Sequence, residues 1–262
     1  MKSFKNFSQA YRQTLKECIY SPDFIVGGNK PYQEKINYSF KLTDPYNNLF
    51  KNKIRDINLN YLKEELKLYF MGKNDAISFS KASKFWNNIK TDQGLINSAY
   101  GYNLFIKKNC FGYTNFEWAI KTLKKDINTR QAVFHISTPE YNYNGNLDYP
   151  CTMYGIFHIR DNKLYLSINM RSNDVFFGIV YDIPFFLLLM QCALLELKKH
   201  YPNLKIGYYY HFANSMHIYN KNIELLKKSL NYPFRENQMP VLNKNIILNI
   251  KNYINFYRWL NN

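Results

Sequence analysis

A long, almost wholly apolar segment constrains the fold of this chain more than any other feature of its sequence. The segment covers residues 182–200, and its apolar run at 183–197 is interrupted only by Gln191 and Glu196. It opens with Asp182-Ile183-Pro184, a helix N-terminal signal, because aspartate caps helices and proline fits their first turn. The apolar run is too short to span a bilayer. We therefore expect one long, mostly buried helix at about 182–200 in the core of a folded domain.

Helices and strands are mixed along the rest of the chain. Residue periodicity predicts helices at 62–70, 115–125 and 220–230, and strands at 131–137, 155–160, 164–170 and 206–210. The turn signal Asp161-Asn162 predicts a hairpin between two of these strands. This mixture predicts an α/β or α+β fold with a mixed sheet. No repeat or Pro/Gly/Ser-rich linker divides the chain, so we expect a single domain over residues 1–262.

The charge balance favours an anionic partner. The net charge is +16, which suits nucleic acid, a membrane surface, or phosphorylated and carboxylated small molecules. A nucleic-acid-binding protein is one alternative, supported by the charge and the abundant tyrosine. The lysines are scattered, however, and no binding module is recognised, so we expect no direct binding of nucleic acid.

The cysteines and the first residues indicate the compartment. None of Cys18, Cys110, Cys151 and Cys192 forms a C-x-x-C pair, and we expect no metal site. The chain starts with polar and charged residues, so we expect no signal peptide. We expect a reduced cytoplasmic protein, or one in the host cytoplasm if the source is viral, that does not associate with membranes.

Three short patterns carry chemistry. Cys151 follows Pro150 and precedes a predicted strand; taken alone, such a cysteine is more often a small buried hydrophobe than a nucleophile. Arg171 and Ser172 suit a phosphate by bidentate pairing and hydroxyl donation, although a surface turn with an ion pair would fit as well. Strand alternation puts His217 and Tyr219 on one face, where both can hydrogen-bond one hydroxyl; singly, each would be a satisfied core residue.

Together these residues resemble the thymidylate synthase family, in order and at family-like spacing. The resemblance rests on Pro150-Cys151, residues 171–178, Asp182 and His217-Ile218-Tyr219. Upstream, residues 65–72 resemble the family's E-L-x-W-F-L-x-G helix end. Trp86 and Tyr100-Gly101 resemble its folate-side tryptophan and Y-G pair, and Thr129-Arg130 resembles its S-R-R segment. The resemblance covers about residues 65–225 and implies the family's fold, a large mixed sheet flanked by helices.

The resemblance implies a covalent mechanism on a pyrimidine nucleotide. The thiolate of Cys151 would add to C6 and turn C5 into a carbon nucleophile, which attacks the one-carbon unit of 5,10-methylenetetrahydrofolate. Arg171 and Ser172 would hold the nucleotide phosphate, and the guanidinium would also lower the pKa of Cys151. His217 and Tyr219 would bind the sugar 3′-hydroxyl.

Further residues take family roles by the same resemblance. Glu65 would act as general acid and base through ordered water, helped by Tyr100. Asp174 would hydrogen-bond the pterin, and Trp86 and Gly178 would line the folate site. A nucleotide and a folate are both anionic, which fits the basic composition.

The resemblance also implies a homodimer in which Arg130 reaches the partner's active site. The second arginine of the family's pair is Gln131 here, which leaves the phosphate one cation short. Lys30, in the loop Gly27-Gly28-Asn29-Lys30, is a candidate to replace it.

Asp182 departs from the synthase pattern, which has asparagine at this position. Asparagine accepts from uracil N3–H and donates to O4, whereas a carboxyl group fits cytosine: one oxygen accepts from the 4-amino group and a protonated oxygen donates to N3. The same change marks the deoxycytidylate hydroxymethylases, the phage branch of the family. The alternative is that Asp182 is only a helix N-cap, but asparagine caps about as well.

Other departures agree with a remodelled site. Thr152 replaces the histidine after the cysteine, Asn214-Ser215-Met216 replaces the family's G-D before H-x-Y, Ile89 replaces the second tryptophan of W-x-x-W, and the chain terminus that normally caps the site is unrecognisable. A site that admits water would hydroxymethylate rather than methylate. The leading hypothesis is 5-hydroxymethylation of dCMP. The alternatives are thymidylate synthase and a dUMP or CMP hydroxymethylase.

Overall fold

A mixed β-sheet forms the centre of the molecule. Its strands are β1 (Lys2–Phe4), β2 (Phe24–Val26), β3 (Tyr32–Leu42), β5 (Val133–His135), β6 (Thr152–Arg160), β7 (Lys163–Met170), β8 (Asn173–Asp174) and β9 (Lys205–Tyr219). They lie in the order β1-β3-β9-β7-β6-β5, with β2 paired to β3 and β8 to β9. Parallel pairs (β1–β3, β7–β9, β8–β9) stand beside antiparallel ones. The predicted mixed sheet is confirmed.

The computed structural model describes residues 1–242, and the chain terminus considered above lies outside them. A separate two-stranded sheet pairs β4 (Leu49–Lys51) with β10 (Arg235–Asn237). The helices are α1 (Phe7–Tyr20), α2 (Leu59–Phe70), α3 (Ala76–Ala82), α4 (Tyr100–Phe105), α5 (Asn115–Lys125), α6 (Ile179–Lys198) and α7 (Asn220–Leu230), with the 3-10 turns η1 (Lys84–Asn88) and η2 (Pro139–Tyr141). The predicted helices at 115–125 and 220–230 therefore have the observed bounds.

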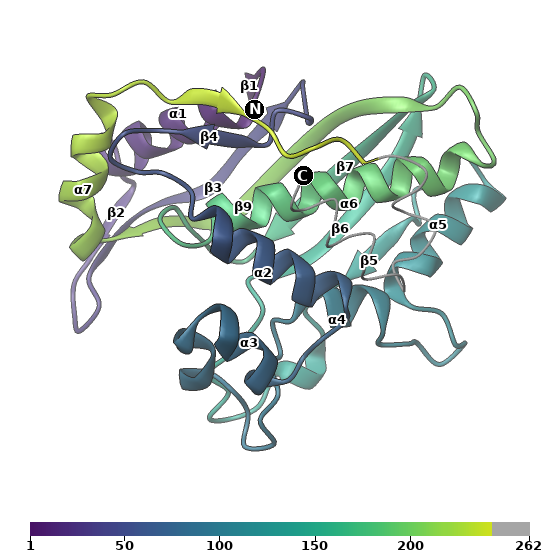
Figure 1. Cartoon of the computed structure of the whole chain (residues 1–262), viewed down its shortest axis with the longest axis horizontal. Helices are drawn as coiled ribbons and strands as arrows, with labels where there is room; N and C mark the ends of the chain where they lie inside the picture. Colours follow the sequence, from purple (N-terminus) through teal and green to yellow (C-terminus); the bar gives the residue numbers. More distant parts are fainter. Residues whose placement is uncertain (243–262) are drawn as a thin grey trace.

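The long apolar helix is α6, which lies across the sheet with α2 beside it (Figure 1). It begins at Ile179 after the N-cap Gly178, three residues earlier than the Asp182 signal predicts, because Ile179 and Val180 are fully buried and extend the apolar surface. By length and hydropathy α6 could cross a membrane, but 78% of its apolar window is buried inside the molecule, as in a core helix.

The strands around α6 create the framework of the site. The Asp161-Asn162 turn has φ angles of 49° and 55°, as a two-residue hairpin requires, and joins β6 to β7 as predicted. From β7 the chain continues through β8 and α6 to β9, which lies parallel to β7. The strand predicted at 206–210 is part of β9. This strand continues to Tyr219 and therefore includes His217 and Tyr219, two of the predicted site residues.

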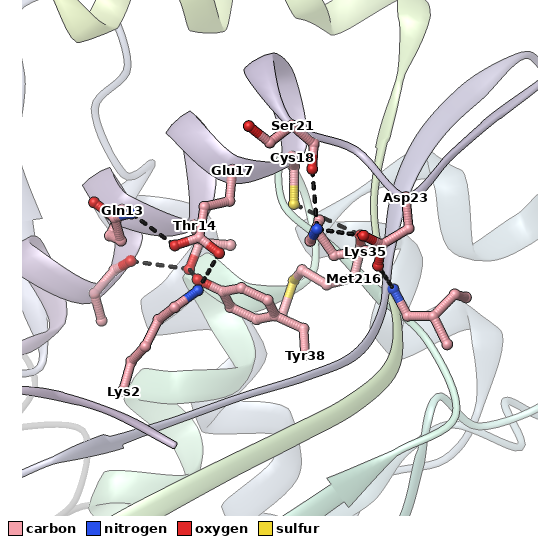
Figure 2. Close-up of polar contacts among 12 residues, drawn as sticks. Lys2, Gln13, Thr14, Glu17, Cys18, Ser21, Asp23, Lys35, Tyr38 and Met216 are labelled. Atoms are coloured by element: carbon pink, nitrogen blue, oxygen red, sulfur yellow. Dashed lines mark hydrogen bonds and ion pairs between the residues drawn. The ribbon is translucent and has the colours of Figure 1, made fainter.

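Helix α1 packs on the sheet and supports the end of β9 (Figure 2). The hydroxyl of Thr14 bonds the Tyr38 hydroxyl of β3 at 3.2 Å, and Cys18 Sγ lies 3.6 Å from the carbonyl oxygen of Met216 on β9. Thr14, Cys18, Tyr38 and Met216 are all buried. The contact of Cys18 with Met216 therefore holds β9 against α1 at the residue that precedes His217.

The opposite face of the sheet is half-exposed. Helices α1, α5 and α6 pack on one face, where alternate strand residues are fully buried. Most of the residues that point the other way on β6, β7 and β9 are aromatic or apolar and only partly covered, namely Tyr154, Ile156, Tyr165, Tyr208, Tyr210 and Phe212; the polar residues His158, Ser167 and Asn169 lie among them. Such a contiguous surface is typical of a protein–protein contact.

Candidate functional site

Three helices meet at the site through stacked aromatic rings. Tyr69 of α2 stacks on Tyr100 of α4 at 5.5 Å and packs on Phe185 of α6 at 4.9 Å between ring centroids. Gly101 permits this approach, since a Cβ there would lie 1.9 Å from the carbonyl oxygen of Tyr69. The packing brings Glu65, Tyr100 and Asp182, which are far apart in sequence, into one electrostatic cluster.

Glu65 lies buried between two tyrosines of its own helix. Its Oε1 accepts from the Tyr61 hydroxyl at 2.8 Å and from the Tyr69 hydroxyl at 3.3 Å. Burial raises the pKa of Glu65 to about 7, and the two hydrogen bonds oppose that rise. A carboxyl group with a pKa near neutrality can both give and take a proton, which is what a general acid and base requires.

Cys151 stands at the start of β6, against Arg171 at the end of β7. The guanidinium donates to the carbonyl oxygens of Tyr149 (2.7 Å) and Pro150 (3.1 Å), and its Nη2 lies 3.7 Å from Cys151 Sγ. Burial raises the pKa of the Cys151 thiol to about 11, while Arg171 lowers it. Arg171 thus acts in the predicted direction, and desolvation outweighs this one partly solvated cation, so the pKa of the thiol stays above its usual value.

Residues 171–174 run alongside β9 and bring the phosphate and sugar candidates together. The backbone of Asp174 is level with His217 in the register of β8 and β9, and Ser172 Oγ lies 3.2 Å from His217 Nδ1. The rings of His217 and Tyr219 are 5.2 Å apart, so the two residues share a face as predicted. Burial lowers the pKa of His217, which keeps the ring neutral near physiological pH.

Asp182 is not a helix cap. It lies in the first turn of α6, and the N-cap is Gly178. Its Oδ2 accepts from Asn173 Nδ2 at 2.7 Å, and Tyr100 donates a further hydrogen bond to its carboxyl group. Burial, together with the charge of Glu65, raises the pKa of Asp182 to about 8. The carboxyl therefore retains its proton at neutral pH.

Asn173 continues into a buried polar chain that sequence reasoning missed. Its Oδ1 lies 3.0 Å from His211 Nε2, and His211 Nδ1 lies 2.9 Å from the hydroxyl of Tyr209. The signal was present as Tyr209-x-His211, an alternation on one strand face like that of His217 and Tyr219. Its partner Asn173 could not be found by spacing, because the contact crosses between β8 and β9.

The residues predicted to bind folate surround the same cluster. Asp174 is half-buried, and its Oδ1 accepts from the backbone of Phe176 at 2.7 Å; burial raises its pKa. Trp86 is buried edge-on against Phe79, with ring centroids 5.0 Å apart. Arg55, which sequence reasoning also missed, is buried with its guanidinium 4.4 Å from the ring of Phe176 and bonded to that residue's carbonyl oxygen.

Gly178 is needed for packing around Asn173. A Cβ at this position would lie 2.7 Å from Asn173 Nδ2 and 2.9 Å from the carbonyl oxygen of Asp174. We expect Gly178→Ala to reduce the free energy of unfolding by about 1–3 kcal/mol, because the amide or the backbone must move. Urea denaturation would measure the free energy of unfolding. An unchanged midpoint would contradict the predicted clash of the added Cβ with Asn173 and Asp174.

Two of the basic residues predicted to bind phosphate, Arg130 and Lys30, do not lie with the other site candidates. Arg130 is exposed just before the edge strand β5, and within residues 1–242 no hydrogen bond or ion pair joins it to another candidate. Lys30 is exposed in the loop before β3, where Pro31 accepts from the backbone of Asn220 and Tyr32 pairs with Tyr219. That loop is therefore next to the sugar-side candidates. Residues 1–242 contain no group of three His, Cys, Asp or Glu side chains that could hold a metal ion.

The fold and this cluster define a class of enzyme, one in which a cysteine lies near two carboxyl groups of raised pKa at the end of a mixed sheet. The chain belongs to the thymidylate synthase family, whose model matches residues 12–257. The match extends beyond the 65–225 region in which the sequence resemblance is evident. The protein is accordingly a one-carbon transferase that acts on a nucleotide, in a family that uses methylenetetrahydrofolate as co-substrate.

Individual relatives include phage enzymes. The deoxycytidylate 5-hydroxymethyltransferase of Enterobacteria phage T6 is 26% identical over 227 residues, which cover 82% of this chain and 87% of the relative. The deoxyuridylate hydroxymethyltransferase of Bacillus phage SP01 is 27% identical over 222 residues, covering 81% of this chain and 57% of the relative. The solved thermostable thymidylate synthase A of Bacillus subtilis has the same fold, with a TM-score of 0.70 at 18% identity over 87% of this chain and 85% of that one.

Proposed function

We propose that the protein converts dCMP, 5,10-methylenetetrahydrofolate and water into 5-hydroxymethyl-dCMP and tetrahydrofolate. The proposal treats the whole chain as one domain and places it in the cytoplasm, where both substrates occur. The observation that carries it is the buried carboxyl group of Asp182, which keeps its proton and interacts with Cys151. A neutral carboxyl offers one donor and one acceptor, which cytosine N3 and the 4-amino group require.

The reacting atoms would meet around Cys151. Its sulfur adds to C6 of the base, and a donor at N3 draws electrons from the ring and eases that addition. Because burial raises the pKa of the thiol to about 11, its proton must leave as the S–C6 bond forms. Glu65, with a pKa of about 7, would exchange protons near the base through water. Arg171 and Ser172 would hold the phosphate, while His217 and Tyr219 would bind the sugar hydroxyl.

The residues on the folate side fit a pterin. Trp86 and Phe176 offer flat apolar surfaces, and Asp174 offers a carboxylate acceptor beside the buried guanidinium of Arg55. When bound, methylenetetrahydrofolate would supply a one-carbon unit at the oxidation level of formaldehyde. Gly178 keeps the segment between Asp174 and α6 free of side-chain bulk.

Competition between the two nucleotides tests the proposal. The protein is incubated with equal dCMP and dUMP plus methylenetetrahydrofolate, and the products are read by mass spectrometry. We expect dCMP to gain one CH2O unit and dUMP to remain unchanged. A CH2 gain on dUMP alone would identify a thymidylate synthase, and a CH2O gain on dUMP alone would identify a dUMP hydroxymethylase. A parallel reaction with CMP tests whether the enzyme distinguishes deoxyribose from ribose.

The affinity for dCMP should depend on pH through Asp182. Its pKa in the folded protein is raised to about 8, so the protonated donor is present below that pH and is lost as the pH rises through it. We expect the Kd for dCMP to rise roughly tenfold per pH unit above 8. Isothermal titration calorimetry should measure this Kd, because the pH dependence of turnover would also reflect the titration of Glu65. The Asp182→Asn variant is the control and should lack this dependence.

The proposal includes a homodimer formed through the half-exposed sheet face. The pKa of Cys151 stays high with Arg171 beside it, and within residues 1–242 the exposed Arg130 has no hydrogen bond or ion pair to another site candidate. An Arg130 side chain from a second copy would add a phosphate ligand and would lower the pKa of the thiol. The aromatic residues on the open face, from Tyr154 to Phe212, supply an apolar surface for such a contact.

Mixing inactive variants tests whether Arg130 acts across the dimer. We expect Arg130→Ala and Cys151→Ala to be inactive separately. Random exchange of subunits puts both lesions into one site of each heterodimer and leaves the other site intact, so about a quarter of all sites should recover. Light scattering should give twice the monomer mass. No recovery from a mixture that demonstrably exchanges subunits would contradict the role of Arg130 across the dimer.

A further inference from the structure

Three buried polar side chains behind Asp182 have no role in the proposed reaction. They are Tyr209 and His211, both fully buried on β9, and Asn173, which is 1% exposed on β8. Hydrogen-bond distances of 2.9, 3.0 and 2.7 Å link Tyr209, His211, Asn173 and Asp182 in that order. Three polar groups placed in a dry interior are costly unless every one is satisfied, so their arrangement calls for an explanation.

The tyrosine at the far end sets the direction of this array. Among residues 1–242, His211 Nδ1 is the only hydrogen-bond partner of the Tyr209 hydroxyl. Burial raises the pKa of Tyr209 well above its usual value, so the phenol keeps its proton. A buried O–H with one partner donates to it. Tyr209 therefore donates, and His211 Nδ1 accepts.

The remaining directions follow from the neutrality of the imidazole. Burial lowers the pKa of His211 to about 3, so the ring carries a single N–H. Since Nδ1 accepts, that proton is on Nε2 and is donated to Asn173 Oδ1. The amide then turns its NH2 group to Asp182 Oδ2. We call Tyr209, His211 and Asn173 the donor array, because every bond in it points toward Asp182.

The donor array determines what Asp182 can offer to a base. If the oxygen of Asn173 faced Asp182 instead, Asp182 would donate its proton to Asn173. Only acceptor lone pairs of the Asp182 carboxyl group would then face the base. Two acceptors cannot serve N3 of cytosine, which itself accepts. Because Asn173 presents an N–H, Asp182 satisfies it with a lone pair and keeps its single proton for the ligand.

We propose that Tyr209, His211 and Asn173 are positioning residues that hold the proton of Asp182 toward the base and thereby set the preference for cytosine; this rests on the proposed action on dCMP. Glu65, Tyr100, Asp174 and Cys151 also face Asp182 from other elements. Tyr100 donates a further hydrogen bond to the carboxyl group of Asp182, and the other three residues act on its charge, so none of the four sets the direction of the Asn173 contact.

Tyr209→Phe is the first test, because it removes one hydroxyl and fills the same space. His211 can then move its proton to Nδ1, which lets Asn173 turn over. We expect the ratio of kcat/KM for dCMP to that for dUMP to fall roughly tenfold. Tyr38→Phe is the matched control: it also removes a buried hydroxyl that is hydrogen-bonded to a neighbouring helix on the same sheet face (Figure 2). It should leave that ratio unchanged.

Asn173→Ala provides a second readout that a purely structural role would not change. The Asn173 hydrogen bond lowers the pKa of Asp182, so its loss should move the alkaline limb of dCMP binding to higher pH while weakening binding below pH 8. Nitrogen-15 NMR of His211 should show the neutral Nε2–H tautomer in the wild-type protein. An Nδ1–H tautomer or an imidazolium would overturn the assigned direction.

The outcomes separate the two proposals. If the wild-type enzyme modifies dCMP but folded Tyr209→Phe and Asn173→Ala proteins keep its base ratio and pH limb, the donor array is only structural and this inference is overturned. An equal shift in Tyr38→Phe would also overturn it, since general loosening would then explain the effect. A wild-type enzyme without activity on dCMP would overturn the proposed function itself.

Discussion

Replacing Asp182 with asparagine is expected to reverse the base preference of the enzyme. The amide can no longer supply a carboxyl proton to cytosine N3, and it offers an acceptor and an NH2 donor that match uracil N3–H and O4. A mismatch of buried polar partners at one base is costly, so the ratio of kcat/KM for dCMP to that for dUMP should fall by at least about 100-fold. Steady-state kinetics with each nucleotide is the measurement.

The comparison needs a folded variant. Asparagine keeps an oxygen for the Asn173 N–H, so the buried contact survives and Asp182→Asn should melt at or above the wild-type temperature. Unchanged preference in a folded variant would show that Asp182 does not choose the base. Asp182→Ala serves as the contrast: it should lose dCMP activity without gaining dUMP activity.

Removing the thiol of Cys151 should have the largest effect of any single change. In the proposed mechanism no bond forms at C6 without the sulfur and C5 does not become nucleophilic, so we expect kcat to fall by at least about 10⁴-fold in Cys151→Ala. Exchange of tritium from C5 of dCMP into water reports the addition step separately from the complete reaction. Both signals should disappear.

Binding is the control for this variant. Arg171 donates to the carbonyl oxygens of Tyr149 and Pro150 as well as lying near Cys151, so it should stay in place when the sulfur is removed. The Kd of Cys151→Ala for dCMP should therefore remain within a few-fold of wild type. Residual tritium exchange at the wild-type rate would mean that another nucleophile acts, and Cys192 and Cys18 are too deeply buried to replace it.

Local periodicity was sufficient for much of the fold. The predicted hairpin, the helices at 115–125 and 220–230 and the buried helix near 182 all follow from side-chain patterns that depend on neighbours along the chain. The start of α6 could not be placed correctly, because a strong capping signal at Asp182 competes with the burial of Ile179 and Val180, and tertiary packing decides between them. The length of β9 was missed for a related reason, since its register on β3 is set by pairing between distant segments.

The candidate site was predictable where a motif is contiguous. Residues 171–174 and His217-x-Tyr219 meet because β8 pairs with β9, as the motif order implies. Arg55 and Asn173 were not found, since they gain their importance from burial and from partners on other elements. His211 was missed although its alternation with Tyr209 is visible in the sequence. The pKa of the thiol could be predicted only in part, because the cation that lowers it can be recognised in sequence, whereas the desolvation that raises it cannot.

The proton on Asp182 also has a thermodynamic consequence for the protein without ligand. An aspartate that titrates near pH 4 when unfolded and at about 8 when folded binds more protons in the folded state between those values. The contribution of Asp182 to the free energy of unfolding should therefore decrease as the pH rises from about 4 to 8. Under the proposed function, a bound nucleotide would accept the proton of this carboxyl group. Ligand binding and the stability of the fold would then be linked through one hydrogen atom, and the enzyme without nucleotide should be the less stable form.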